Sequence, residues 1–260
     1  PEKSELIQKG NAQFMRNIKI NIQYDGTRYS GWQSQEHDEN TIQGKLTAVL
    51  RRLLEEETEL AGSGRTDAGV HALGQVANFK TCSCMSCEEI LEKLNHYLPE
   101  DIAVISAEEM DGRFHSRLNA VRKTYSYRIW NSSVHNVFER RYTWFIEQPL
   151  DVSAMRRAAA ELTGTHDFRA FSSIKRGKKS TVRTIESIDI DQDGSAITLS
   201  FTGNGFLYHM VRILTGTLVE VGLHKKTPED MKRILASLSR EQAGVMAPAQ
   251  GLFLMEVEYQ

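Results

Sequence analysis

The sequence has few cysteines and no long apolar runs. Its three cysteines, Cys82, Cys84 and Cys87, lie in one short stretch of the 260 residues. An odd, clustered set is a poor framework for disulfides between distant segments, so it favours a reducing, cytoplasmic compartment. No apolar run reaches the length of a membrane span, and residues 1–14 lack the apolar stretch of a signal peptide. We therefore expect a protein that is neither exported nor inserted in a membrane.

Proline is also scarce, at 5 residues, while the remaining proportions are ordinary, with 40% hydrophobic and 25% charged residues. This composition excludes collagen-like, mucin-like and disordered chains. At roughly 100 to 150 residues per domain, the length predicts two domains that need no disulfide or metal for stability.

Charge divides the chain into two parts. Residues 1–112 contain 11 basic and 19 acidic residues, a net charge of −8, whereas residues 113–260 contain 21 and 15, a net charge of +6. We expect an N-terminal domain over residues 15–112 and a basic C-terminal domain over residues 113–260. Residues 1–14 show no clear periodicity, and we expect them to be an extension, either disordered or left over from cloning.

The positive charge is densest in residues 113–183, where 15 basic residues accompany 5 acidic ones. A solvated basic surface would have the same charge. Aromatic residues are interspersed with these cations, however, and that combination is typical of nucleic-acid binding. The pattern therefore favours a nucleic-acid partner.

Hydrophobic periodicity orders the first half as β-α-β-β-α-β. Ile18, Ile20 and Ile22 alternate with polar residues as in a half-buried strand, and apolar residues spaced three and four apart indicate two amphipathic helices. The predicted strands are residues 16–24, 59–61, 75–80 and 102–107, and the predicted helices are residues 41–54 and 86–97.

The second half repeats this order with an extra leading strand and an extra helix. Asp193-Gly194 between two alternating segments is typical of a hairpin turn. The predicted strands are residues 124–130, 142–146, 182–190, 196–202 and 252–259, and the predicted helices are residues 152–163, 206–222 and 228–238.

Two such units predict an α+β fold of two ferredoxin-like (βαββαβ) domains with antiparallel sheets and an active-site cleft between them. RNA-recognition modules share this topology, but the chain has no clear basic-Gly-aromatic-Gly-aromatic motif. The fold alone therefore does not identify a function.

Residues 61–72 (AGSGRTDAGVHA) form a small-residue loop between two predicted strands, which allows another molecule to approach its backbone. No Gly-Lys-Ser/Thr follows, and Asp67 stands where the third glycine of a dinucleotide fingerprint belongs. ATP and NAD are therefore not indicated. Taken alone, Asp67 fits a turn-forming residue better than a catalyst.

Longer motifs favour a catalytic role for Asp67 over a turn-forming one. They are residues 24–27 (YDGT), 29–33 (YSGWQ), 63–72 (SGRTDAGVHA), 74–76 (GQV), 114–117 (FHSR), 123–127 (KTYSY), 183–185 (RTI) and 206–212 (FLYHMVR). With these motifs the chain resembles the TruA-type tRNA pseudouridine synthase family over most of its length. Only residues 1–14 and 82–87 look unlike it.

The resemblance implies roles for four residues. Asp67 matches the catalytic carboxylate, which attacks the uridine or removes a sugar proton, and both routes require it ionised. Arg212 is expected to pair with Asp67, and Arg65 to contact the flipped nucleotide or its neighbours. Tyr125 is expected to stack on the target base and to serve in proton transfer. Without the resemblance, Arg212 and Tyr125 would fit a snorkelling arginine and an ordinary strand aromatic.

Further residues are expected to contact RNA or to support the site. The expected RNA-binding residues are Arg117, Lys175, Arg176, Lys178 and Lys179, although residues 175–179 also fit a plain solvated loop. Three histidines in the motifs, His71, His115 and His209, are expected to form supporting hydrogen bonds, with His71 also a candidate RNA contact. No metal site is predicted, because the cysteine cluster has no matching second cluster.

By resemblance, the chain is an isomerase that converts uridine to pseudouridine at positions 38 to 40 of the tRNA anticodon stem-loop. We expect tRNA as the partner, no metal, nucleotide or other cofactor, and a homodimer. One alternative is a non-catalytic RNA-binding protein on the same fold, against which the joint presence of Asp67, Tyr125 and Arg212 argues. Another is the same chemistry on a different RNA, for which the sequence offers no discriminator.

Overall fold

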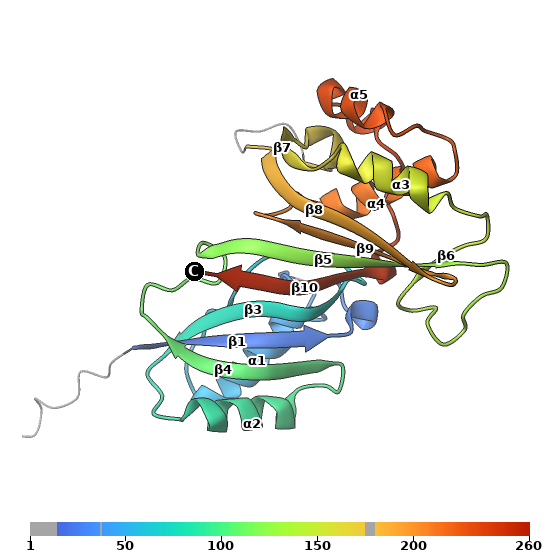
Figure 1. Ribbon diagram of the computed structural model, residues 1–260. Coiled ribbons are helices and arrows are strands. Elements are labelled where there is room, and N and C mark those ends of the chain that lie inside the picture. The colour runs from blue at the N-terminus through green and yellow to red at the C-terminus, as the bar shows by residue number, and fades with distance from the viewer. Residues whose placement is uncertain (1–14, 37, 175–179) are drawn as a thin grey trace, which may run out of the picture.

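The computed structural model describes residues 15–36, 38–174 and 180–260. In this part of the chain, ten strands form one sheet in the order β4-β1-β3-β10-β5-β9-β8-β7, with β2 paired to β3 and β6 paired to β5 (Figure 1). The strands are β1 (Arg16–Tyr24), β2 (Ala61–Gly62), β3 (His71–Thr81), β4 (Ile102–Met110), β5 (Ala120–Asn131), β6 (Trp144–Ile146), β7 (Gly164–Asp167), β8 (Val182–Asp193), β9 (Ala196–Gly203) and β10 (Leu252–Tyr259). The helices are α1 (Ile42–Leu54), α2 (Cys87–Tyr97), α3 (Val152–Ala160), α4 (Met210–Gly222) and α5 (Asp230–Ser237).

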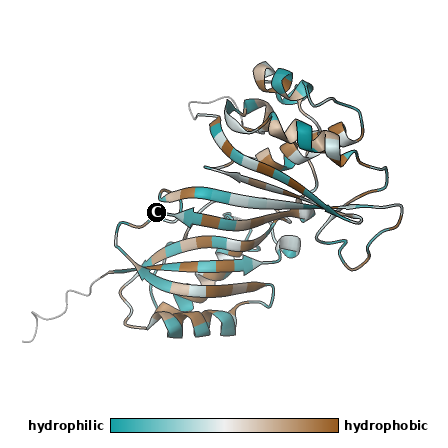
Figure 2. Ribbon diagram, in the orientation of Figure 1, coloured by the Kyte–Doolittle hydropathy of each residue, from teal (hydrophilic) through white to brown (hydrophobic). Residues whose placement is uncertain are grey.

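The elements form where periodicity and capping agree. In β1 the alternating Ile18, Ile20 and Ile22 are fully buried, and the alternation of apolar and polar positions along the strands is visible in Figure 2. Helix α1 begins after Thr41, whose side chain accepts a hydrogen bond from the Gly44 N–H. These signals are local, which is why the sequence predicts these elements.

The ten strands differ from the expected pair of separate antiparallel sheets. Strand β10 pairs antiparallel with β5 and, at Phe253 and Leu254, parallel with His71 and Ala72 of β3. This short parallel pairing joins the two halves of the chain into one mixed sheet. Periodicity reports which face of a strand is buried but not which strand lies at its edge, so it cannot predict this junction.

Some boundaries also differ from the prediction. Helix α4 begins at Met210 rather than at residue 206, because His209 before it has a positive φ of 63°, which interrupts helical geometry. Strand β7 is not predicted at all, since its four residues, Gly164–Asp167, are half-buried or exposed and show no apolar alternation. Strand β6 is limited to Trp144–Ile146.

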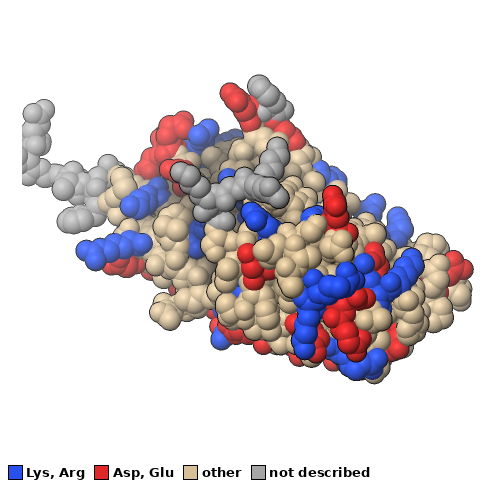
Figure 3. Space-filling view, turned by 90° about the horizontal axis from the view of Figure 1, so that it is seen from above, with Lys and Arg blue, Asp and Glu red and all other residues tan. Residues whose placement is uncertain are grey.

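The helices divide between the halves of the sheet. Helices α1 and α2 lie with strands β1, β3 and β4. Helices α3 and α4 lie on the side of β8 and β9, and α5 lies beyond α3 (Figure 1). Seen from above, Lys and Arg side chains mix with Asp and Glu rather than forming one uniform positive surface (Figure 3). None of the helices in the described residues is long and apolar enough to cross a membrane.

Candidate active site

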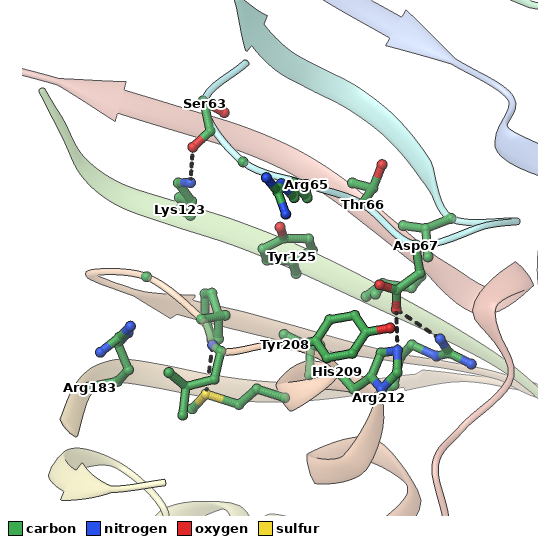
Figure 4. A pocket seen from close by; sticks show the side chains of 18 of the residues that line it. Ser63, Arg65, Thr66, Asp67, Lys123, Tyr125, Arg183, Tyr208, His209 and Arg212 are labelled. Atoms are coloured by element: carbon green, nitrogen blue, oxygen red, sulfur yellow. Dashed lines mark hydrogen bonds and ion pairs between the residues drawn. The ribbon is translucent and has the colours of Figure 1, made fainter. Parts of the chain in front are cut away.

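A pocket of about 580 Å³ lies where the loop after β2 meets elements of the second half. Its walls come from residues 63–67, from strand β5, from the start of β8 and from residues 204–212 (Figure 4). Residues of both expected domains therefore line it. The sequence-predicted residues Asp67, Arg65, Tyr125, Arg212 and Arg117 all lie in its wall.

The loop that holds Asp67 is fixed by the residue before it. The Thr66 carbonyl oxygen accepts a hydrogen bond from the Trp32 N–H at 3.0 Å, and its hydroxyl is 2.8 Å from the Tyr24 hydroxyl. Behind Asp67, its own carbonyl oxygen accepts from the Val70 N–H at 3.1 Å, which closes a turn. Asp67 thus has the turn position predicted from its residue type, and its side chain still faces the pocket.

Two positively charged or hydrogen-bonding side chains face the Asp67 carboxylate. Arg212 Nη1 donates to Oδ2 at 2.8 Å, while Arg212 Nε donates to the Ala247 carbonyl oxygen at 2.8 Å. His209 Nε2 lies 3.4 Å from the same Oδ2. The Asp67 and Arg212 side chains are only 21% and 11% exposed, so their attraction is weakly screened. The geometry brings together Asp67 and Arg212, which lie 145 positions apart.

Tyr125 supplies an aromatic wall on β5. Its ring is 9% exposed and meets Phe206 edge to face, with ring centroids 5.3 Å apart. Burial, and then the nearby Tyr24 and Asp67, raise the pKa of the Tyr125 phenol, so it remains protonated at neutral pH. Tyr125 therefore offers an apolar ring and a hydroxyl proton to the same pocket.

Lys123 lies two residues before Tyr125 and is a site residue that the sequence reasoning missed. Its Nζ donates to the Ser63 carbonyl oxygen at 2.6 Å. Burial, and secondarily the charge of Arg117, lowers the Lys123 pKa to about 8. The sequence could have indicated Lys123, since residues two positions apart in a strand share a face and Tyr125 was already a predicted site residue.

The pocket is strongly cationic. Its wall contains Arg65, Arg117, Lys123, Arg183 and Arg212, and Asp67 is the one carboxylate among the described residues that line it. No ion pair with a carboxylate is present at Arg65, Arg117, Lys123 or Arg183 within the described ranges. Cations without carboxylate partners suit a polyanionic ligand.

The other predicted residues do not line this pocket in the described part of the chain. Lys175, Arg176, Lys178 and Lys179 lie outside the described residues. His71 is 1% exposed and accepts a hydrogen bond from the Gly26 N–H through Nδ1, so the supporting role is confirmed and an RNA contact is not available to it. His115 also has a support role, because its Nδ1 accepts from the Arg117 N–H.

Among the residues that the structure describes, no group of three or more His, Cys, Asp or Glu is placed to hold a metal ion. None of Cys82, Cys84 and Cys87, which all lie in the described residues, forms a disulfide.

Comparisons with known proteins identify the family. A family profile described as tRNA pseudouridine synthase matches residues 20–118 and 158–260. A tRNA pseudouridine synthase A 2 from Clostridium tetani is 46% identical over 246 residues, which cover 94% of this chain and 99% of that protein. A tRNA pseudouridine synthase A from Bacillus strain KSM-64 is 49% identical over 245 residues, covering 94% and 100%. One from Moorella thermoacetica is 48% identical over 243 residues, covering 93% and 99%.

The chain belongs to the tRNA pseudouridine synthase family. The predicted enzyme class, an isomerase, is confirmed by this membership.

Proposed function

We propose that this protein isomerises uridine to pseudouridine at positions 38 to 40 of the tRNA anticodon stem-loop, with Asp67 as the catalytic carboxylate. The observation that supports this most is the environment of Asp67. It is the lone acid among the described residues of a cationic pocket, and Arg212 Nη1 contacts its Oδ2 at 2.8 Å. The guanidinium makes a charge-assisted hydrogen bond at that distance, which holds the Asp67 carboxylate in place in the pocket.

The remaining pocket residues fit the other requirements of the reaction. The C1′–N1 bond breaks, the uracil turns, and a new bond forms between C1′ and C5, so the free base must be retained. A volume of about 580 Å³ accommodates a nucleotide that has left its helix. The Tyr125 ring supplies a stacking surface, and its protonated hydroxyl is a candidate for proton transfer at the base.

The basic residues fit RNA binding. Arg65 and Arg117 line the pocket without carboxylate partners in the described chain, and we assign them to the flipped nucleotide and the neighbouring backbone. Lys175, Arg176, Lys178 and Lys179 remain predicted phosphate contacts. Replacing Lys178 and Lys179 with Ala should flatten the salt dependence of tRNA binding, and an unchanged slope would remove them from the proposal.

We also propose that residues 15–112 and 113–260 are two ferredoxin-like units. The strand orders β4-β1-β3-β2 and β10-β5-β9-β8 have the same arrangement relative to the chain, which supports this division. With tRNA as substrate, we expect a homodimer that works in the cytoplasm. Sedimentation of the protein with and without tRNA tests the dimer.

The test uses unmodified tRNA that contains 5-tritiated uridine, without added metal or nucleotide. Wild-type protein should release tritium to water, because C5 exchanges its hydrogen for the glycosidic bond. Asp67→Asn should bind the tRNA and release none, since it removes the charge at nearly constant shape. If the wild type binds tRNA tightly and releases no tritium, the protein is a non-catalytic RNA-binding member. Mapping of the product positions tests the anticodon stem-loop assignment.

A further inference from the structure

The Asp67 carboxylate uses its two oxygens differently. Oδ2 accepts from Arg212 Nη1 at 2.8 Å and lies 3.4 Å from His209 Nε2. No hydrogen bond or ion pair reaches Oδ1 from any of the described residues. In Figure 4 the two dashed lines drawn to Asp67 end on the same carboxylate oxygen, and the other oxygen turns toward the Tyr125 side of the pocket. Oδ1 is therefore the oxygen whose lone pairs remain for a substrate.

His209 is held in position on its other side. Its Nδ1 is 2.9 Å from the Ser173 hydroxyl, and the Ser173 N–H donates to the Tyr208 carbonyl oxygen at 3.1 Å. The ring stacks on Tyr208, with centroids 3.6 Å apart. The backbone of His209 has a positive φ of 63°, a conformation that turns the chain before α4. Backbone and side-chain contacts together thus aim Nε2 at Asp67.

The protonation of the ring follows from its two neighbours. Burial, and then the charges of Arg212 and Arg240, lower the His209 pKa, against the opposing effect of Asp67, so the ring is neutral near pH 7. A neutral imidazole has one N–H and one lone pair. With the proton on Nδ1, the Nε2 lone pair would face a carboxylate oxygen, which is repulsive. The tautomer with the proton on Nε2 avoids this repulsion, and it requires Ser173 to donate to Nδ1.

We propose that Ser173 and His209 are positioning residues for Asp67: the Ser173 hydroxyl donates to His209 Nδ1, the Nε2–H faces Oδ2, and Asp67 meets the substrate through Oδ1. The inference rests on the proposed function of Asp67. It adds a row of contacts from Ser173 through His209 to Asp67, which restrains the Asp67 carboxylate together with Arg212. These contacts connect the segment before β8, which holds Ser173, with the loop after β2, which holds Asp67.

The first experiment reads the tautomer without RNA. Long-range ¹H–¹⁵N spectra of protein labelled at histidine nitrogens distinguish the protonated ring nitrogen from the unprotonated one, and His209→Asn assigns the signal. We expect the proton of His209 on Nε2 in the wild type and a partial shift to Nδ1 in Ser173→Ala. Ser173→Thr retains a hydroxyl and should restore the wild-type spectrum. A proton on Nδ1 in the wild type would overturn the proposal.

The second experiment measures single-turnover kinetics on tritiated tRNA. His209→Asn suits the positive φ but has no donor at the Nε2 position, so its rate at saturating enzyme should fall about tenfold, with tRNA affinity unchanged. Ser173→Ala should lose about threefold and Ser173→Thr should recover it. Thermal unfolding near the wild-type temperature shows that the variants fold. The matched control is His166→Asn, whose ring contacts the Thr163 carbonyl oxygen away from the pocket and should not change the rate.

The two experiments distinguish failure of the proposed function from failure of the positioning role. A wild type that releases no tritium refutes the proposed function, while the tautomer measurement still stands. An active wild type whose rate is unchanged in His209→Asn refutes the positioning role. A rate loss in Ser173→Ala that Ser173→Thr does not restore would also refute it, because a donor at that position would then be irrelevant.

Discussion

Lys123 Nζ donates to the Ser63 carbonyl oxygen at 2.6 Å and so joins strand β5 to the loop that holds Asp67. The contact is close, since a Cβ added at Gly64 would come within 2.9 Å of Nζ. Lys123 is partly buried, and its ammonium has no carboxylate partner in the described part of the chain. A cation that is partly removed from water and has no anion beside it lowers the stability of the folded protein.

That cost should appear in the pH dependence of stability. Burial lowers the Lys123 pKa from 10.5 to about 8, so between these pH values the unfolded chain binds a proton that the folded chain does not. The free energy of unfolding therefore rises with pH across this window. Relative to Lys123→Met, the wild type should gain about 3 kcal/mol between pH 7 and pH 10.5. Urea unfolding of both proteins at the two pH values measures this, and parallel pH profiles would mean that Lys123 titrates normally.

Tyr125 and Tyr127 allow a matched test of the hydroxyl group. The Tyr125 hydroxyl has no hydrogen-bond partner in the described residues, whereas the Tyr127 hydroxyl donates to the Pro248 carbonyl oxygen at 2.7 Å. Tyr125→Phe should retain its stability and lose about tenfold or more in single-turnover rate if the hydroxyl moves a proton. Tyr127→Phe should lose about 1 kcal/mol in unfolding free energy and keep its rate. Equal rates in both variants would restrict Tyr125 to stacking.

Local signals in the sequence predict most of the individual elements. The Asp193-Gly194 turn joins β8 to β9, as expected from residue type. Helix α2 lies at its predicted place, and the structure adds that Ser86 and Glu89 form a capping box at its start. No such local signal predicts the parallel pairing of β10 with β3. Apolar residues in a strand indicate that it is buried, but they do not specify which strand lies next to it. Long-range pairing is decided by packing of the whole sheet, which one sequence does not report.

In the site, too, some features can be predicted from the sequence and others require the structure. A motif of ten residues indicates Asp67, and the motif at the start of α4 indicates Arg212, but their distance of 2.8 Å depends on the fold of both halves. His209 and Ser173 are 36 positions apart, and no spacing rule connects them. Lys123 looks like an ordinary strand lysine until its burial is known. Residue types thus predict the chemistry of the site, while contacts between distant segments require the structure.

Arg212 should be more than a positive charge. Its Nη1 contacts Asp67 and its Nε contacts the Ala247 carbonyl oxygen, so the guanidinium is fixed at two points. A lysine has one compact donor group and cannot make both contacts. Arg212→Lys should reduce the single-turnover rate about 100-fold with tRNA affinity within about twofold.

The matched control is Arg233→Lys on α5, where the guanidinium pairs with Asp230 on the exposed surface. Its rate should equal the wild-type rate. A normal rate in Arg212→Lys would show that charge alone suffices beside Asp67.

Gly31 should determine where Asp67 lies, although it does not line the pocket. Gly31 has a positive φ of 100°, and an alanine Cβ there would lie 2.7 Å from the Thr66 carbonyl oxygen, directly before Asp67. Both the strained φ and the clash oppose a side chain, so Gly31→Ala should lose about 2 to 3 kcal/mol of unfolding free energy. The same clash pushes the Thr66 carbonyl away from the Trp32 N–H that holds it at 3.0 Å.

The Gly31 variant should therefore also lose activity at temperatures where it remains folded, because Asp67 shifts with Thr66. Gly112→Ala is the control, since its Cβ would meet nothing within 4 Å. Chemical unfolding and single-turnover tritium release on both variants separate the two effects. If Gly31→Ala is destabilised yet reacts at the wild-type rate while folded, the loop positions Asp67 independently of Gly31, and the contacts of Asp67 with Arg212 and His209 are sufficient to hold the carboxylate.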